Sequence, residues 1–139
     1  MTRESLIVPV TVEFEDVDAY GIAHHARLVA FLERARLRFL SERGLPVHPE
    51  GCTPVLYDLQ MRYRAPARLL DRLDVTVELA AMDDFTVTLA YGIRRGGESL
   101  ARARTVIAFR DARGEAPAPV PEAFRARWAA ATGDGPGGR

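Results

Sequence analysis

The chain has 139 residues, a length that fits one domain with a hydrophobic core and leaves no room for a second. Hydrophobic residues make up 47% and charged residues 27%, as in an ordinary globular protein, and 19 basic side chains balance 19 acidic ones. This balance gives no overall field that would steer the protein to nucleic acid or an anionic membrane, and no apolar run approaches the length of a membrane span.

The first third of the chain changes from the period of a strand to that of a helix. Alternating apolar residues predict a half-buried strand over residues 8–14, and acidic residues and Gly21 then interrupt the pattern. From Ala26 onward, a helix is predicted by apolar residues at helical spacing: Leu28, Phe31, Leu32, Ala35, Phe39 and Leu40. Gly44 and Pro46 predict its end.

The rest of the chain is predicted to be mostly strands. Alternation predicts four of them, over residues 55–63, 73–79, 85–93 and 101–109, with Gly96-Gly97 as a hairpin turn. Pro121 opens a short terminal helix, and a disordered tail is expected over residues 132–139 after a single domain over residues 1–131. One broad apolar helix face and an antiparallel meander predict an α+β fold in which a five-stranded sheet wraps the long helix.

The segment "DVDAYGIAHHARLVAFLERAR", residues 16–36, places acids, a glycine and two histidines just before that helix. Backbone N–H groups at a helix N-terminus can stabilise an oxyanion, and a nearby carboxylate such as Asp18 can attack a carbonyl or activate water. Acids in this position are also common as helix caps, so the residues alone leave both interpretations open. The adjacent His24 and His25 are expected to point apart on a helix, which predicts no metal site.

The same segment resembles the signature of hotdog-fold acyl-CoA thioesterases, in the 4-hydroxybenzoyl-CoA thioesterase and YbgC-like branch. That branch typically reads D-x-D-x-x-G and then a helix ending in F-x-E-x-A-R. The matching residues here are Asp16, Asp18, Gly21, His25, Phe31, Glu33, Ala35 and Arg36. The later "MRYRAPARLLDRLDVTVEL" is similar to the second and third strands of the family, so the resemblance covers residues 6–125.

The resemblance implies a hydrolase that converts a thioester to a free acid and a thiol. In it, Asp18 acts as nucleophile or general base, and the backbone N–H at His25 polarises the carbonyl. Gly21 takes the position of close approach to substrate, and Glu33 matches the helix glutamate, either catalytic or in an ion pair. The resemblance leaves Asp16 with a turn or capping role.

For the substrate, the resemblance implies coenzyme A as part of the thioester and no metal or other cofactor. Tyr20 and His24 are expected beside the substrate, and Arg64 and Arg68 are the candidates to bind the phosphates. The sequence departs from the usual pattern at Tyr20 and at Arg27-Leu28, which puts the identity of the acyl group in doubt.

The family also implies a homo-oligomer, dimer or tetramer, with active sites at subunit interfaces. The single Cys52 and the absence of a signal-peptide pattern predict a cytoplasmic protein with no membrane or nucleic-acid partner. An acyl-carrier-protein thioester is the alternative substrate, because Arg34 and Arg36 are available on the helix. A non-catalytic acyl-CoA-binding module is a third alternative, and the missing Asn-Pro pair disfavours a hydratase.

Overall fold

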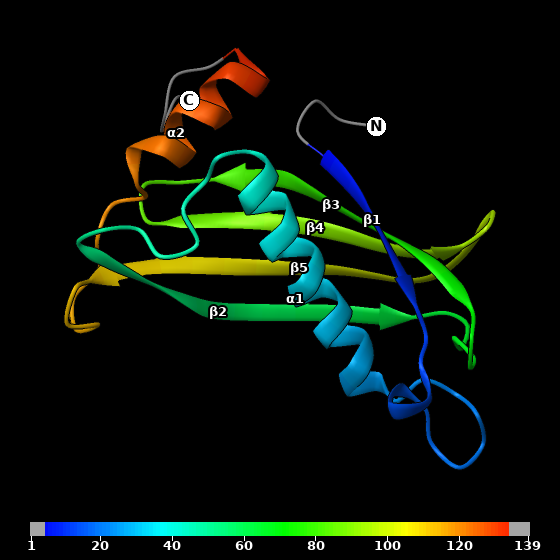
Figure 1. Cartoon of the computed structure of the whole chain (residues 1–139). Helices are drawn as coiled ribbons and strands as arrows, with labels where there is room; N and C mark the ends of the chain where they lie inside the picture. The colour runs from blue at the N-terminus through cyan, green and yellow to red at the C-terminus, as the bar shows by residue number, and fades with distance from the viewer. Residues whose placement is uncertain (1–4, 134–139) are drawn as a thin grey trace.

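A computed structural model describes residues 5–133 (Figure 1). Its elements in chain order are β1 (Ser5–Thr11), the 3-10 helix η1 (Phe14–Asp16), α1 (His25–Glu42), β2 (Cys52–Tyr63), β3 (Arg72–Met82), β4 (Thr86–Arg95), β5 (Glu98–Asp111) and α2 (Glu122–Thr132). The predicted architecture is confirmed: a five-stranded antiparallel sheet, one long helix and a short helix near the C-terminus. The expected tail lies largely in residues 134–139, outside the described residues.

The strands lie in the order β1-β3-β4-β5-β2, so β1 and β2 are the two edges of the sheet. The predicted Gly96-Gly97 turn is confirmed: β4 ends at Arg95, β5 begins at Glu98, and Gly96 adopts a φ of +59° that favours glycine. Pairing of β3, β4 and β5 in register places alternate side chains of all three strands on one face, which forms the floor of the core.

Helix α1 crosses that inner face and packs mainly against β1 and β3 (Figure 1). Its buried residues are those that the helical spacing predicts: Leu28, Phe31, Leu32, Ala35, Phe39 and Leu40. They meet buried valines and leucines of the sheet, so that burial of the apolar helix stripe holds the fold together. No helix in the described part of the chain is long and apolar enough to cross a membrane.

The expectation of a strand continuing to Phe14 is wrong. β1 ends at Thr11, and Phe14 begins η1 with its side chain 82% exposed. The carboxylate of Asp16 accepts a hydrogen bond from the Glu13 N–H at 2.8 Å, and this capping bond turns the chain out of the sheet. Val12 remains fully buried after the strand ends, which is why the alternation of apolar residues continued past it.

The edge strand β2 pairs only with β5 and lies away from α1. Apolar side chains along it are exposed: Val55, Leu56, Tyr57, Leu59 and Tyr63. A bulge interrupts the pairing between Leu56 and Asp58. The sheet therefore has one long apolar edge without a neighbouring strand, and a space remains between this edge and the helix.

Candidate active site

Asp18 lies in an exposed loop whose own backbone holds its carboxylate. Oδ1 accepts hydrogen bonds from the backbone N–H of Tyr20 at 2.8 Å and from that of Ile22 at 3.3 Å. No donor among the described residues binds Oδ2. The loop thus fixes the orientation of the carboxylate through one oxygen and leaves the other open to water or substrate.

Gly21 forms the turn of this loop. Its φ of +75° is a conformation that side chains rarely adopt, and its N–H donates to the carbonyl of Asp18 at 3.0 Å. Val17 and Ala23 close the base of the loop as an antiparallel bridge. The glycine therefore allows the chain to reverse between Asp18 and the start of α1.

Helix α1 begins with one backbone N–H that has no acceptor in the described part of the chain. The N–H groups of Arg27 and Leu28 donate to the carbonyl of His24 at 2.8 and 3.3 Å, and that of Ala26 donates to Nδ1 of His24 at 3.2 Å. The N–H of His25 makes no hydrogen bond to any described residue. A free donor at the positive end of a helix is suited to polarise a carbonyl oxygen.

Asp16 joins the loop to the helix. Its side chain is only 4% exposed, and its Oδ1 accepts a hydrogen bond from Nε of Arg27 at 2.7 Å. Its backbone carbonyl accepts from the N–H of His24 at 2.9 Å. A buried carboxylate is costly unless it is paired, so this ion pair defines where α1 begins relative to Asp18. Sequence reasoning missed it because a turn separates the two residues, so their spacing of eleven residues carries no periodic signal of contact.

A second segment, residues 66–71, supports the loop from behind. The N–H of Leu69 donates to the carbonyl of Gly21 at 3.1 Å, and that of Ala23 donates to the carbonyl of Ala67 at 2.8 Å. Leu70 adopts a φ of +69°, which is strained for a leucine. The site loop is therefore held between η1, α1 and this segment.

Asp71 anchors the supporting segment to the sheet. Its Oδ2 accepts from the N–H of Arg68 at 2.8 Å and from the guanidinium of Arg95 at 2.5 Å, and Arg95 also pairs with Glu98 at 2.7 Å. Burial by itself would raise the pKa of the Asp71 carboxyl. The hydrogen bond from Arg68 and the charge of Arg95 outweigh burial and lower this pKa.

The two histidines do not point apart as the sequence analysis expected. Their rings are stacked with centroids 4.3 Å apart, because His24 is the extended N-cap residue and not part of the helix. Among the described residues, no group of three His, Cys, Asp or Glu side chains is placed to hold a metal ion.

Of the other predicted site residues, some lie beside the Asp18 loop and others lie away from it. Tyr20 is 85% exposed at the tip of the Asp18 loop, and Arg68 forms a bridge with Ile22 at its side. Arg64 instead lines a shallow depression on the sheet together with Arg94 and Arg102. The structure therefore brings Arg68 to the site and does not bring Arg64 there.

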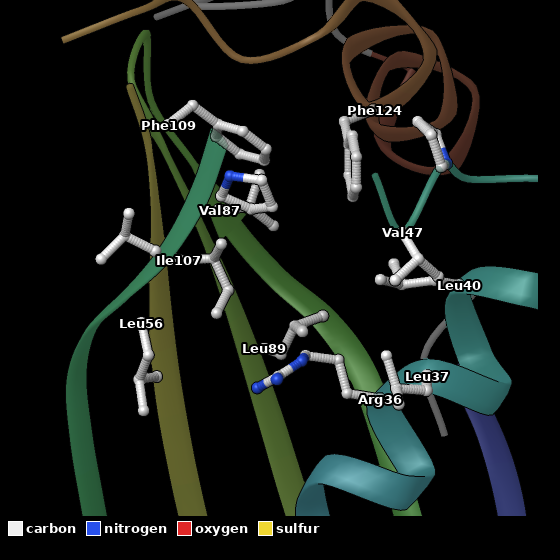
Figure 2. A pocket seen from close by; sticks show the side chains of 13 residues that line it. Arg36, Leu37, Leu40, Val47, Leu56, Val87, Leu89, Ile107, Phe109 and Phe124 are labelled. Carbon is white, nitrogen blue, oxygen red and sulfur yellow. The ribbon is translucent and has the colours of Figure 1, made fainter. Parts of the chain in front are cut away.

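A groove runs along α1 between the helix and β2. Its first part, of about 280 Å³, begins at Ala26 in the first turn and is lined by Val29, Ala30, Leu32, Glu33, Arg36, Leu56, Leu59 and Thr105. Its second part, of about 120 Å³, shares Arg36 and Leu56 and ends among Val87, Phe109 and Phe124 (Figure 2). Glu33 lies at the side of the groove, 64% exposed and 3.6 Å from Arg36.

The described part of the chain thus combines an exposed carboxylate, a helix N-terminal N–H without an acceptor and an apolar groove on an α+β scaffold, which are groups of the kind that acyl-transfer chemistry uses. Residues 12–128 match the family model of the thioesterase-like superfamily, and the chain belongs to this family. A crystal structure of a 1,4-dihydroxy-2-naphthoyl-CoA thioesterase from Synechocystis superposes with a TM-score of 0.81 at 21% identity, covering 86% of this chain and 92% of that one. The fold is thus the hotdog fold that the sequence analysis expected.

Two curated relatives are similar in sequence. The acyl-CoA thioester hydrolase YbgC of Escherichia coli O6:H1 is 40% identical over 79 residues, which cover 53% of this chain and 58% of that protein. The acyl-CoA thioesterase YbgC of Haemophilus influenzae is 29% identical over 122 residues, covering 85% of this chain and 90% of that protein. The match to the Escherichia coli relative therefore spans less than two thirds of its length.

Removing the charge of Asp71 tests how the site loop is supported. Because folding lowers the pKa of this carboxyl, its ionised form stabilises the fold above the unfolded pKa of about 3.9, and this stabilisation disappears as the pH falls through the folded value. We expect Asp71→Asn to reduce the free energy of unfolding by about 1 kcal/mol at pH 7. The difference from wild type should shrink as the pH is lowered toward 3.

Urea denaturation at several pH values measures this effect. Asp74→Asn is the matched control, since Asp74 is an exposed aspartate on β3, the strand that begins directly after Asp71. If Asp71→Asn lowered the free energy of unfolding by the same amount at every pH, the stabilising role of the ionised Asp71 carboxylate would be contradicted.

Proposed function

We propose that this protein hydrolyses acyl-CoA thioesters to a free acid and coenzyme A. The observation that carries the proposal is the combination, within residues 18–25, of an open carboxylate oxygen on Asp18 and an unpartnered N–H at His25. Membership of the thioesterase-like superfamily and the names of the curated relatives support the same substrate class. Coenzyme A enters as part of the substrate, and the mechanism needs no other cofactor.

In the proposed mechanism, the thioester carbonyl oxygen accepts a hydrogen bond from the N–H of His25. Oδ2 of Asp18 then either attacks the carbonyl carbon, giving an anhydride that water opens, or takes a proton from a water molecule that attacks instead. In both routes the C–S bond breaks and the thiolate leaves. It takes up the proton that the hydrolytic water gives up and becomes the free thiol. Water supplies the new oxygen of the acid.

The neighbouring side chains receive supporting roles. Tyr20, exposed in the Asp18 loop, and His24, the N-cap residue of α1, are proposed to contact the substrate. Arg68, whose backbone pairs with Ile22, is the better placed of the two predicted arginines to meet a phosphate. Glu33 is exposed beside Arg36, so an ion pair explains it without a catalytic role. Residues 18–25 are restrained by η1 and α1 on one side and by the segment 66–71 on the other. Such restraint gives the rigidity that a reacting site requires.

We further propose that two copies of the chain associate along β2. This strand presents unpaired backbone groups and a row of exposed apolar side chains over twelve residues, a surface that natural proteins rarely leave uncovered. Pairing with a second β2 would extend the sheet and cover the groove that runs between β2 and α1. The acyl group would then bind at the subunit interface.

The role of Asp18 is tested by replacing its carboxylate with an amide. We expect Asp18→Asn to reduce kcat by about 10³-fold, because the amide neither attacks the carbonyl nor accepts a proton from water. Thiol release from benzoyl-, phenylacetyl- and aliphatic CoA esters, and from the same acyl groups on a carrier protein, measures activity and identifies the carrier. Glu15→Gln, in the neighbouring η1, is the control. Near wild-type turnover by Asp18→Asn would transfer the role to another acid, with Glu33 tested next.

The role of the His25 N–H is tested by replacing His25 with proline. Proline has no backbone N–H, so the substitution removes this one donor. Proline is well tolerated at the first residue of a helix, and the extended His24, with a ψ of 140°, suits a following proline. We expect His25→Pro to lower kcat by about 10²-fold while helix content is unchanged. His25→Ala keeps the N–H and should retain most activity. Equal losses in the two variants would assign the effect to the imidazole instead.

Association along β2 is tested by placing negative charges on its exposed face, because like charges on two paired strands repel each other. We expect light scattering to give wild type a mass of at least twice the 15.4 kDa chain, and Tyr57→Glu/Tyr63→Glu to shift it toward the monomer. Ile7→Glu is the control, because Ile7 is exposed on β1, the opposite edge of the sheet from β2. A monomeric wild type at micromolar concentration would rule out this interface.

A further inference from the structure

Arg36 is a cation in an otherwise apolar part of the groove. Its side chain is only 18% exposed, and it lines both parts of the groove. Figure 2 shows the guanidinium extending from α1 toward the strands, among side chains that include Leu56, Leu89 and Ile107. Arg34 and Arg38, which precede and follow it, are exposed on other sides of the helix.

The neighbours of Arg36 leave most of its donors without an acceptor. Glu33 is the only carboxylate paired with it in the described part of the chain, at 3.6 Å, and Glu33 is largely exposed to solvent. The hydroxyl groups of Tyr91 and Thr105 lie 2.7 Å apart and bond to each other. Burial raises the pKa of Tyr91, and the hydrogen bond with Thr105 together with the charge and a hydrogen bond of Arg36 opposes this effect. The guanidinium therefore reaches the Tyr91 hydroxyl, which can engage one of its donors.

A guanidinium has five N–H donors and favours a planar pair of oxygens. Burying it beside leucine and isoleucine side chains is unfavourable unless an oxygen acceptor arrives. The helix, the sheet and the supporting segment supply no buried carboxylate to Arg36 among the described residues. Tyr91 and Glu33 can engage only part of the five donors, and the remaining ones are best satisfied by the molecule that fills the groove.

The position of Arg36 sets the length of that molecule. Residues 25 and 36 are eleven steps apart, about three turns, so they lie on the same side of α1 and about 16 Å apart along its axis. The Arg36 side chain reaches across toward the strands. Its guanidinium therefore lies on the order of 10–15 Å from the N–H of His25, the shorter value applying where the side chain leans back toward the helix N-terminus. This distance corresponds to roughly eight to twelve bonds in an extended acyl chain.

We propose that Arg36 binds an oxygen carried at the far end of the acyl group, so that the protein selects acyl groups ending in a carboxylate or hydroxyl over plain hydrocarbons. This inference rests on the proposed thioester hydrolysis, with the carbonyl held at His25. A hydrocarbon of the same length would place its end against the charge and desolvate it without compensation. The charge also stands between the two parts of the groove and hinders passage of a plain chain into the part near Phe124.

Two matched pairs of CoA esters test the proposal. Suberyl-CoA against octanoyl-CoA compares a terminal carboxylate with a methyl group, and 4-coumaroyl-CoA against cinnamoyl-CoA compares a phenolic hydroxyl with hydrogen. We expect wild type to prefer the oxygen-bearing member of at least one pair by tenfold or more in kcat/KM. The pair that shows the preference identifies the source of the oxygen.

Arg36→Met should abolish this preference by lowering kcat/KM for the oxygen-bearing ester and leaving the hydrocarbon ester unchanged or improved. Arg36→Lys keeps the charge and should retain part of the preference. Arg38→Met is the matched control, because Arg38 is exposed and pairs with Glu42 at 3.2 Å. Equal losses for both members of a pair, a preference that survives in Arg36→Met, or no preference in wild type would each overturn the proposal.

A binding measurement separates this proposal from the proposed hydrolysis. Calorimetric titration of wild type and of Arg36→Met with monomethyl suberate and methyl octanoate, which differ only at the far end of the chain, reports recognition without thioester hydrolysis. Tighter binding of monomethyl suberate than of methyl octanoate by wild type, lost in Arg36→Met, would support the role of Arg36 even if no thioester were hydrolysed. Hydrolysis of every ester with no preference would support the enzyme and refute the role of Arg36.

Discussion

The buried carboxylate of Asp16 is the contact on which the geometry of the candidate site depends. It receives hydrogen bonds from the backbone N–H of Glu13 and from the side chain of Arg27, and the backbone carbonyl of Asp16 itself accepts from the N–H of His24. A carboxylate removed from water is tolerated only with such partners, so the chain has little freedom in how η1 meets α1. The positions of Asp18 and of the first N–H groups of the helix follow from this constraint.

The sheet supports the same loop from the opposite side. Asp71 and Arg95 connect the segment 66–71 to the end of β4, and that segment binds the backbone at Gly21 and Ala23. These contacts are independent of Asp16, so the loop is restrained through both helix and sheet. The carboxylate of Asp18, although exposed, is therefore held in one orientation, and a reacting carboxylate gains from such preorganisation.

Helix α1 has two functions in this arrangement. Its apolar stripe forms the core against β1 and β3, while the side facing β2 leaves a groove, because the edge strand lies away from the helix. The free N–H of His25 is at one end of this groove and the guanidinium of Arg36 is further along it. Since the helix is rigid, the separation of these two groups acts as a fixed measure of the ligand that fits between them.

The sequence by itself determined the elements and the candidates for the site. Period-2 and helical spacing predicted the strands and α1, Gly96-Gly97 predicted the hairpin, and the acid–glycine–helix order pointed to Asp18 and Gly21, to which the family resemblance added His25. The prediction failed at Phe14. The apolar alternation in the sequence continues to this residue, but the strand ends earlier, because the capping bond from the Glu13 N–H to the Asp16 carboxylate turns the chain out of the sheet. Only the tertiary structure decided that Asp16 pairs with Arg27, that Asp71 supports the loop and that Arg36, rather than Arg34 or Arg38, enters the groove. Periodicity records which face of an element is apolar, but the burial of a charged side chain depends on which other segment of the chain comes to lie beside it.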